Sequence, residues 1–300
     1  MDPNYSIIIP HKDIPDLLQR CLDSIPLRDD VQVIVVDDNS DPKKVDFAHF
    51  PQWKGKQYEY HLTKEGKGAG FARNVGLEHA KGRWIVFADA DDFFTEDFNG
   101  LLDEMADAEE DMVYFDYINV LSDDITRQVE DRKWYSKFLA AYRIGEMNEA
   151  VFRTMIPVVW CRMIKREFVE RNGIRFSETR WSNDLHFAAQ VGSLAKAVKV
   201  SDRIGYVVTS REGSLTKDFC GTAEELRVRL KESLKSEKTY AQHLLPCKGR
   251  MTSACLAIAY KKKGFLWCAR FALTHLGDWP VAKVMFAFLA KRILRGEVVL

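Results

Sequence analysis

Three aspartates lie within four positions, Asp89, Asp91 and Asp92, directly after the apolar run 84–87 (WIVF). Like charges at this spacing repel, and the cluster becomes favourable when a cation lies among the oxygens. Mg²⁺ and Mn²⁺ prefer oxygen ligands, supplied by one or two carboxylates together with phosphate. The cluster therefore predicts a divalent metal site that acts on a phosphorylated substrate. The structural alternative is that Asp92 or Thr95 caps the helix that follows.

Polar residues also follow two other apolar runs. Pro10 to Asp13 come after the first run, and Asp37 and Asp38 come after the second. The first third of the chain alternates β-rich runs with helical patterns, with strands predicted at 5–10, 31–36, 58–62 and 83–88 and helices at 14–25, 69–80 and 96–108. This alternation predicts an α/β fold with a mostly parallel sheet flanked by helices. Ligands bind beyond the carboxyl ends of the strands in such sheets, so these polar residues are predicted to share one crevice.

The later part of the chain is predicted to become increasingly helical. The expected elements are a pair of strands at 112–120 and 125–134 joined through Ser122 to Asp124, a helical stretch at 136–169 interrupted by Pro157, a helix at 185–195, and two short strands around a turn within 196–208. Long helices are expected at 222–245, 251–276 and 281–296. The change in character places a domain boundary near Cys220 and Gly221, so that residues 221–300 form a C-terminal helical extension.

Composition and charge exclude several classes of protein. Of the 300 residues, 46% are hydrophobic, which is enough for a substantial core, and 44 basic residues balance 44 acidic ones, so no overall field attracts nucleic acid. The six cysteines are scattered and are expected to be reduced. The N-terminus lacks a signal-peptide pattern, and no run of about 18 apolar residues occurs. We therefore expect a cytoplasmic chain that does not span a membrane.

The motifs, taken in order, resemble those of the family 2 glycosyltransferases. The resemblance is carried by SIIIPHKD (6–13), VIVVDDNSD (33–41), GAGFARNVGLEHAKGRWIVFADADD (68–92) with its DXD motif, SND (182–184) and REGSLT (211–216). It is clearest from Tyr5 to Asp92 and extends more weakly to Ser214, whereas the C-terminal helices carry no part of it. It implies a GT-A-type, Rossmann-like fold in which residues 1–220 form the nucleotide-sugar-binding and catalytic domain.

The resemblance implies a nucleotide site at the ends of the first strands. Pro10 and His11 would lie under the base, and Asp38 would accept a hydrogen bond from uracil N3. Arg73 would lie close to the base or the diphosphate. The donor implied by these residues is a nucleotide-diphosphate sugar, with UDP as the expected nucleotide.

For the carboxylate cluster, the resemblance implies metal-dependent chemistry. Asp91 would hold Mn²⁺ or Mg²⁺, Asp89 would contact the ribose beside the metal, and Asp92 would support them. Arg211 and Ser214, in the last motif, would contact the diphosphate or close over it. A bound cation would thus screen the aspartates from one another and join them to the diphosphate.

Asp184 stands at the family's catalytic position and is predicted to act as the general base, with His186 as an alternative base. The implied reaction is a one-step displacement with inversion, which moves the sugar to a hydroxyl of a saccharide or lipid-linked acceptor in cell-surface polysaccharide or lipopolysaccharide biosynthesis. Two alternatives remain: a non-catalytic nucleotide-sugar-binding protein, and a nucleotidyltransferase on a similar fold. The glycines at 64–70 (KEGKGAG) fit a dinucleotide fingerprint poorly, because they follow the third predicted strand instead of the first.

The sequence departs from the family pattern at His11, Lys12, Asp13 and Asn183. The first three stand where apolar, tyrosine or asparagine residues are usual, and they are expected to alter the nucleotide edge without abolishing it. Asn183 is the more serious departure, because a glutamate often precedes the catalytic aspartate.

The C-terminal helices predict a contact with the membrane surface. Apolar residues at helical spacing within 281–295 are accompanied by lysines and arginines, and Lys261 to Lys263 add a second basic cluster. Such a pattern is typical of a helix in the membrane interface, which would hold the chain on the inner face of the membrane beside a lipid-linked acceptor. The alternatives are packing of the apolar stripe against the same chain, or a homo-oligomer contact.

Overall fold

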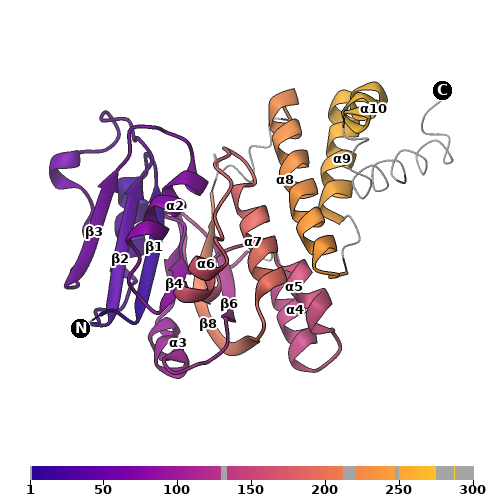
Figure 1. Ribbon diagram of the computed structural model, residues 1–300. Coiled ribbons are helices and arrows are strands. Elements are labelled where there is room, and N and C mark those ends of the chain that lie inside the picture. Colours follow the sequence, from indigo (N-terminus) through magenta and orange to yellow (C-terminus); the bar gives the residue numbers. More distant parts are fainter. Residues whose placement is uncertain (1, 130–133, 212–220, 247–249, 275–286, 288–300) are drawn as a thin grey trace.

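One mixed sheet of eight strands forms the centre of the computed structural model (Figure 1). The structure describes all residues except 1, 130–133, 212–220, 247–249, 275–286 and 288–300. The strand order is β3-β2-β1-β4-β7-β6-β8-β5. The strands are β1 (Tyr5–His11), β2 (Val31–Asp37), β3 (Gln57–Leu62), β4 (Trp84–Phe87), β5 (Phe93–Phe94), β6 (Met112–Leu121), β7 (Arg162–Lys165) and β8 (Val198–Ser210). The helices are α1 (Pro15–Asp23), α2 (Ala69–His79), α3 (Asp97–Met105), α4 (Trp134–Arg143), α5 (Glu149–Met155), α6 (Arg166–Arg171), α7 (Asn183–Leu194), α8 (Ala223–Gln242), α9 (Arg250–Lys263) and α10 (Phe265–Leu273).

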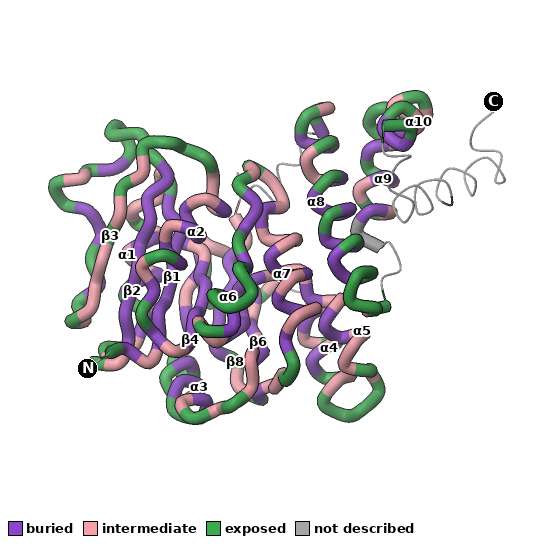
Figure 2. Tube along the Cα trace, viewed as in Figure 1, coloured by how far each residue is buried: buried purple, intermediate pink, exposed green. Residues whose placement is uncertain are grey.

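The N-terminal half of the sheet is parallel. β1 pairs with β2 on one side and β4 on the other, and β2 pairs with β3. Every residue of β1, β2 and β4 is buried (Figure 2), which explains why these strands read as nearly continuous apolar runs. The predicted α/β fold is confirmed. Because the three strands run in the same direction, their carboxyl ends lie at one edge of the sheet.

The helical stretch predicted over 136–169 is wrong at Arg162–Lys165, which form β7. This strand lies between β4 and β6 and is antiparallel to both. Four residues are too few to show a period that separates a strand from a helix. The neighbouring strands therefore decide the conformation of this segment. Four of the seven pairings between the described strands are parallel, so the sheet is mixed but mostly parallel.

The strand expected at 125–134 is wrong over residues 125–129. These form only an isolated antiparallel bridge, between Val120 and Gln128.

The two short strands predicted within 196–208 are a single strand, β8. It runs parallel to β6, and the pairing moves from Tyr114–Val200 to Asp116–Ile204, so that β8 carries the extra residues of a bulge. A bulge of this kind lets the ladder continue on both sides of unpaired residues. The polar residues that resembled a turn are therefore accommodated inside the strand.

The C-terminal helices α8, α9 and α10 surround a second apolar cluster that includes Leu226, Leu256 and Phe271. α8 lies beside α7, and α9 beside α8 (Figure 1). Residues 251–276, expected as one helix, contain α9 and α10, because Gly264 between them adopts a left-handed φ of 77°. The division of the chain near residue 220 stays a prediction.

The membrane prediction falls mostly on residues that the structure does not describe, since these include nearly all of 281–296. Lys261, Lys262 and Lys263 occupy the last turn of α9 and are exposed. Of the helices in the described ranges, none is both long and apolar enough to cross a bilayer.

Gly70 packs tightly against the segment that leads into α7. A Cβ atom at this position would lie 2.1 Å from the Ser177 carbonyl oxygen and 2.8 Å from Asn183 Cβ. We therefore expect Gly70→Ala to lower the free energy of unfolding by about 1–3 kcal/mol, the usual range for overpacking. Urea denaturation measures the loss.

Gly100→Ala is the matched control within helix α3. The three atoms nearest to its Cβ would all belong to the end of the flexible, partly exposed Arg203 side chain, the first at 2.7 Å. Alanine favours a helix over glycine by about 1 kcal/mol, so this variant should be as stable as the parent or more so. Equal effects of the two substitutions would show that the contact at Gly70 is unimportant.

Candidate functional site

The last residues of β1 and the end of β2 are joined by a buried pair, His11 and Asp37. His11 Nδ1 lies 2.7 Å from Asp37 Oδ2, and the Ile14 amide donates to His11 Nε2 at 3.2 Å. Since Nε2 accepts, the proton lies on Nδ1 and is donated to Asp37. Pro10 and His11 are both buried at the end of β1. His11 thus links the carboxyl ends of β1 and β2. Its position beneath a nucleotide base stays a prediction.

Asp38 presents a buried acceptor at the same edge. Its Oδ2 accepts from the Gly68 amide at 2.8 Å, and its carbonyl accepts from Lys12 Nζ at 2.8 Å. Its Oδ1 is buried and has no hydrogen-bond partner among the residues that the structure describes. An unpaired buried acceptor is costly, so this oxygen is suited to accept from a ligand.

Arg73 connects three segments of the site. From α2, its Nη2 lies 2.5 Å from Asp89 Oδ1, after β4, and its Nη1 donates to Asn183 Oδ1, at the start of α7, at 2.9 Å. The guanidinium also lies 5.4 Å from the centre of the Phe176 ring. Only 6% of Arg73 is exposed. The structure thus brings together the predicted arginine, the aspartate Asp89 and the helix that carries the predicted base.

The carboxylates of Asp89, Asp91 and Asp92 have three different partners. Asp89 pairs with Arg73, and Asp91 Oδ2 accepts from Arg211 Nε at 3.1 Å. Asp92 is buried, and its Oδ1 accepts from the Thr209 amide of β8 at 2.7 Å. Asp91, with a quarter of its side chain exposed, remains open to a ligand.

The electrostatics of this turn favour an added cation. Burial and the charges of Asp91 and Asp89 raise the pKa of Asp92 well above its usual range. Burial and the Asp89 charge also raise the pKa of Asp91, although Arg211 opposes this rise. Burial is the larger cause of both rises, and the aspartate charges add to it, so a cation among these carboxylates would relieve their mutual repulsion. An oxygen-rich site of this kind fits Mg²⁺ or Mn²⁺.

Asp184 lies in the first turn of α7, next to Asn183. Burial raises the pKa of its carboxyl; Arg73 opposes the rise and Asp89 adds to it, so Asp184 belongs to the same electrostatic site. His186 faces a different environment, since burial and Lys235 of α8 lower its pKa to about 4. Residues two apart on a helix point to nearly opposite sides, which separates the two predicted bases.

Some residues of the site could not be predicted from the sequence. Arg20, from α1, donates from Nη2 to the Asp91 carbonyl oxygen at 2.7 Å, and the Asp89 amide donates to the Tyr206 hydroxyl at 2.9 Å. Both contacts join segments that are far apart along the chain, and no local pattern signals them. Of the predicted residues, Ser214 lies outside the described ranges, whereas Arg211 lies inside them.

Curated proteins similar to this chain are named as glycosyltransferases or polysaccharide biosynthesis proteins. The uncharacterized glycosyltransferase EpsJ of Bacillus subtilis is 27% identical over 225 residues, which cover 72% of this chain and 64% of EpsJ. The succinoglycan biosynthesis protein ExoO of Rhizobium meliloti is 26% identical over 227 residues, which cover 72% of this chain and 63% of ExoO. The matched region therefore spans less than two thirds of either relative.

Solved glycosyltransferases share the fold, and a family model identifies the chain. Residues 1–349 of S. aureus TarS, in complex with UDP-GlcNAc, match with a TM-score of 0.59 and 16% identity over 98% of this chain and 92% of that one. The mannosyltransferase PcManGT from Pyrobaculum calidifontis, in complex with GDP-Man and Mn²⁺, matches with a TM-score of 0.55 and 18% identity over 98% and 88%. These likenesses show the GT-A fold. The model of glycosyl transferase family 2 matches residues 6–173, more than half of the sequence, and the chain belongs to this family.

Proposed function

We propose that this chain is an inverting, metal-dependent glycosyltransferase that moves a sugar from a UDP-sugar to a hydroxyl of a saccharide or lipid-linked acceptor. The observation that carries the proposal is the Arg73 bridge, which places Asp89 of the DXD motif and the helix of Asp184 at one edge of the sheet. The relatives point to cell-surface polysaccharides as the pathway, since ExoO is named for succinoglycan biosynthesis and TarS is named a poly(ribitol-phosphate) transferase.

The nucleotide is assigned to the carboxyl ends of β1 and β2. The unpaired Asp38 Oδ1 is available to accept the uracil N3–H, with Pro10 and His11 forming the floor beneath the base. The Arg73 Nε atom is likewise buried and has no hydrogen-bond partner within the described part of the chain, which leaves a donor for the ligand. Arg211, together with Ser214, would contact the diphosphate.

Asp91 is the residue best placed to hold the metal ion. A quarter of its side chain is exposed, Asp89 lies beside it with one oxygen on Arg73, and Asp92 supports the turn through Thr209. When bound, a divalent ion neutralises the diphosphate leaving group as a Lewis acid. One or two carboxylates suffice, because phosphate oxygens complete the coordination of Mg²⁺ or Mn²⁺.

Asp184 is assigned as the general base. The acceptor oxygen forms a bond to the anomeric carbon while the bond from that carbon to the diphosphate oxygen breaks, and the hydroxyl proton passes to Asp184. A raised pKa suits this task, because a base is most effective when its pKa lies near the operating pH. Displacement in one step from the opposite face inverts the anomeric centre.

A screen of nucleotide sugars tests the proposal as a whole. The full chain is incubated with UDP-, GDP- and other nucleotide sugars and Mn²⁺ or Mg²⁺, and release of the nucleoside diphosphate is measured with and without chelator. Metal-dependent release of UDP from one UDP-sugar supports the proposal. Tight binding of UDP without release from any donor favours a non-catalytic binding protein, and release of pyrophosphate from a nucleoside triphosphate and sugar phosphate favours a nucleotidyltransferase.

Asp184→Asn should lower kcat by roughly 100-fold or more while leaving donor affinity nearly unchanged, because only the proton acceptor is lost. In the parent enzyme, kcat should fall as the pH drops through the raised pKa of Asp184, since the base must be ionised. Steady-state kinetics across pH measure both effects. His186→Gln is the control and should keep its activity; loss of turnover in that variant alone would mean that the base is misassigned.

Asp91→Asn should raise the melting temperature of the metal-free protein at neutral pH. The folded-state pKa of Asp91 lies above its ordinary value, so its ionisation opposes folding, and stability is lost as the pH rises through that pKa. The gain should shrink at low pH, where the parent carboxyl is protonated. Calorimetry in EDTA measures it, and Asp29→Asn, at an exposed ion pair with Lys56, is the control.

UDP and Mn²⁺ should then reverse this order. The parent protein should gain thermal stability from the ligands, and Asp91→Asn should gain much less. The metal assignment would be contradicted if Asp91→Asn were less stable than the parent in EDTA. It would also be contradicted if this variant bound UDP and Mn²⁺ as well as the parent does.

A further inference from the structure

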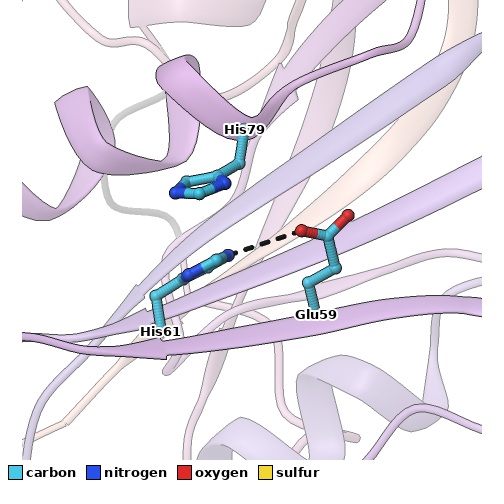
Figure 3. Close-up of side chains that lie close together, drawn as sticks. All are labelled: Glu59, His61 and His79. Carbon is cyan, nitrogen blue, oxygen red and sulfur yellow. Dashed lines mark ion pairs between the residues drawn. The ribbon is translucent and has the colours of Figure 1, made fainter.

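A second group of potential metal ligands lies beneath the far end of α2. Glu59 and His61 point from β3 toward His79, the last residue of α2, and one ligand atom from each lies within 4.8 Å of the others (Figure 3). In the described part of the chain, no other group of three His, Cys, Asp or Glu side chains meets this spacing. The helix begins beside Asp38, through Gly68, and ends at this cluster, so the two sites lie at opposite ends of α2.

The two imidazoles have an unusual environment. Their rings stack with centroids 3.8 Å apart and an interplanar angle of 24°. His61 Nε2 is buried, lies 3.5 Å from Glu59 Oε2, and has no hydrogen-bond partner in the described structure. A neutral imidazole with a free nitrogen is the form that binds a metal ion.

A buried amide fixes the position of these groups. Gln32 Nε2 donates to Glu59 Oε1 at 2.7 Å and to the His79 carbonyl oxygen at 3.1 Å. Gln32 Oε1 accepts from Ser6 Oγ at 2.6 Å and from the Lys81 amide at 2.9 Å, so the orientation of the amide is determined. Outer contacts of this kind hold metal ligands in place in known sites. The carboxyl end of α2 also carries a partial negative charge that favours a cation.

We propose that Glu59, His61 and His79 form a binding site for one divalent cation of the zinc type, separate from the metal of the sugar-transfer site. Two imidazoles and one carboxylate are a typical donor set for Zn²⁺, with water in the fourth position, whereas Mg²⁺ prefers oxygen ligands. The rings are nearly parallel, so one imidazole turns to direct its nitrogen at the shared ion. Lys81 Nζ, 3.3 Å from Glu59 Oε1, has a side chain that is 63% exposed and can move into solvent.

Bound there, the ion joins the edge strand β3 to the helix that carries Arg73. Glu59 and His61 sit on β3, whose residues are only partly buried or exposed, and His79 closes α2. A cation would thereby fix the end of α2 against the sheet. The proposal does not depend on the identity of the sugar or on transfer activity, and a failure of either leaves it untouched.

Competition between the full chain and a chromophoric zinc chelator tests the site. The parent protein should bind one Zn²⁺, and His61→Ala and His79→Ala should each weaken this binding by roughly 100-fold, because a ligand loss costs at least as much as the loss of an outer contact. Asp91→Asn should bind zinc as the parent does. His49→Ala is the matched control, since His49 forms an exposed pair with Asp46 at 2.8 Å and offers no third ligand.

Cobalt substitution supplies a second readout. Co²⁺ should give a visible absorption band in the parent protein, without the thiolate charge-transfer band that cysteine ligation produces, and the band should disappear in His79→Ala. Circular dichroism shows whether each histidine variant folds. If one does not, Glu59→Gln, which keeps the shape of the side chain, is used in its place. The proposal would be overturned if the folded parent protein failed to bind one Zn²⁺. It would also be overturned if the parent, Glu59→Gln and the histidine variants bound zinc with equal affinity.

Discussion

The arrangement of the site depends on one buried charge, the guanidinium of Arg73. An unpaired charge in this position would cost several kcal/mol, and Asp89 and Asn183 accept from its two Nη atoms. The three residues come from α2, the turn after β4 and the start of α7. A movement of any of these elements would therefore expose the guanidinium or remove one of its partners. Gly70 completes the arrangement, because its missing side chain lets α2 approach the segment before α7.

Asn183 is the departure from the family pattern that the Arg73 bridge explains in physical terms. A neutral amide oxygen accepts from Arg73 while Asp89 supplies the one negative charge that the guanidinium needs. A glutamate at this position would add a further carboxylate beside Asp89 and Asp184 in a site whose aspartates already repel one another. The asparagine therefore keeps the geometric link between α2 and α7 without adding to that repulsion.

The sequence predicted the strands that form the edge of the sheet, but it did not predict the side-chain contacts made at that edge. β1, β2 and β4 are buried throughout and were visible as apolar runs, and each carries its polar residues at the end of the strand or directly after it. The partners of those residues were not visible, because the Asp92 carboxylate accepts from Thr209 and the Asp89 amide donates to Tyr206, both from the distant strand β8. Local patterns encode which segment is a strand, whereas the pairing of side chains depends on the completed sheet. β7 was missed for the same reason, since only its neighbours β4 and β6 make Arg162–Lys165 a strand.

The crystal structure of the protein with UDP and Mn²⁺, with the manganese located by anomalous scattering, tests the central assignment most directly. We expect a manganese peak beside Asp91, between this carboxylate and the diphosphate, with the uracil N3 within hydrogen-bond distance of Asp38 Oδ1. A manganese peak away from the turn 89–92, or UDP bound anywhere other than the carboxyl ends of β1, β2 and β4, would contradict it.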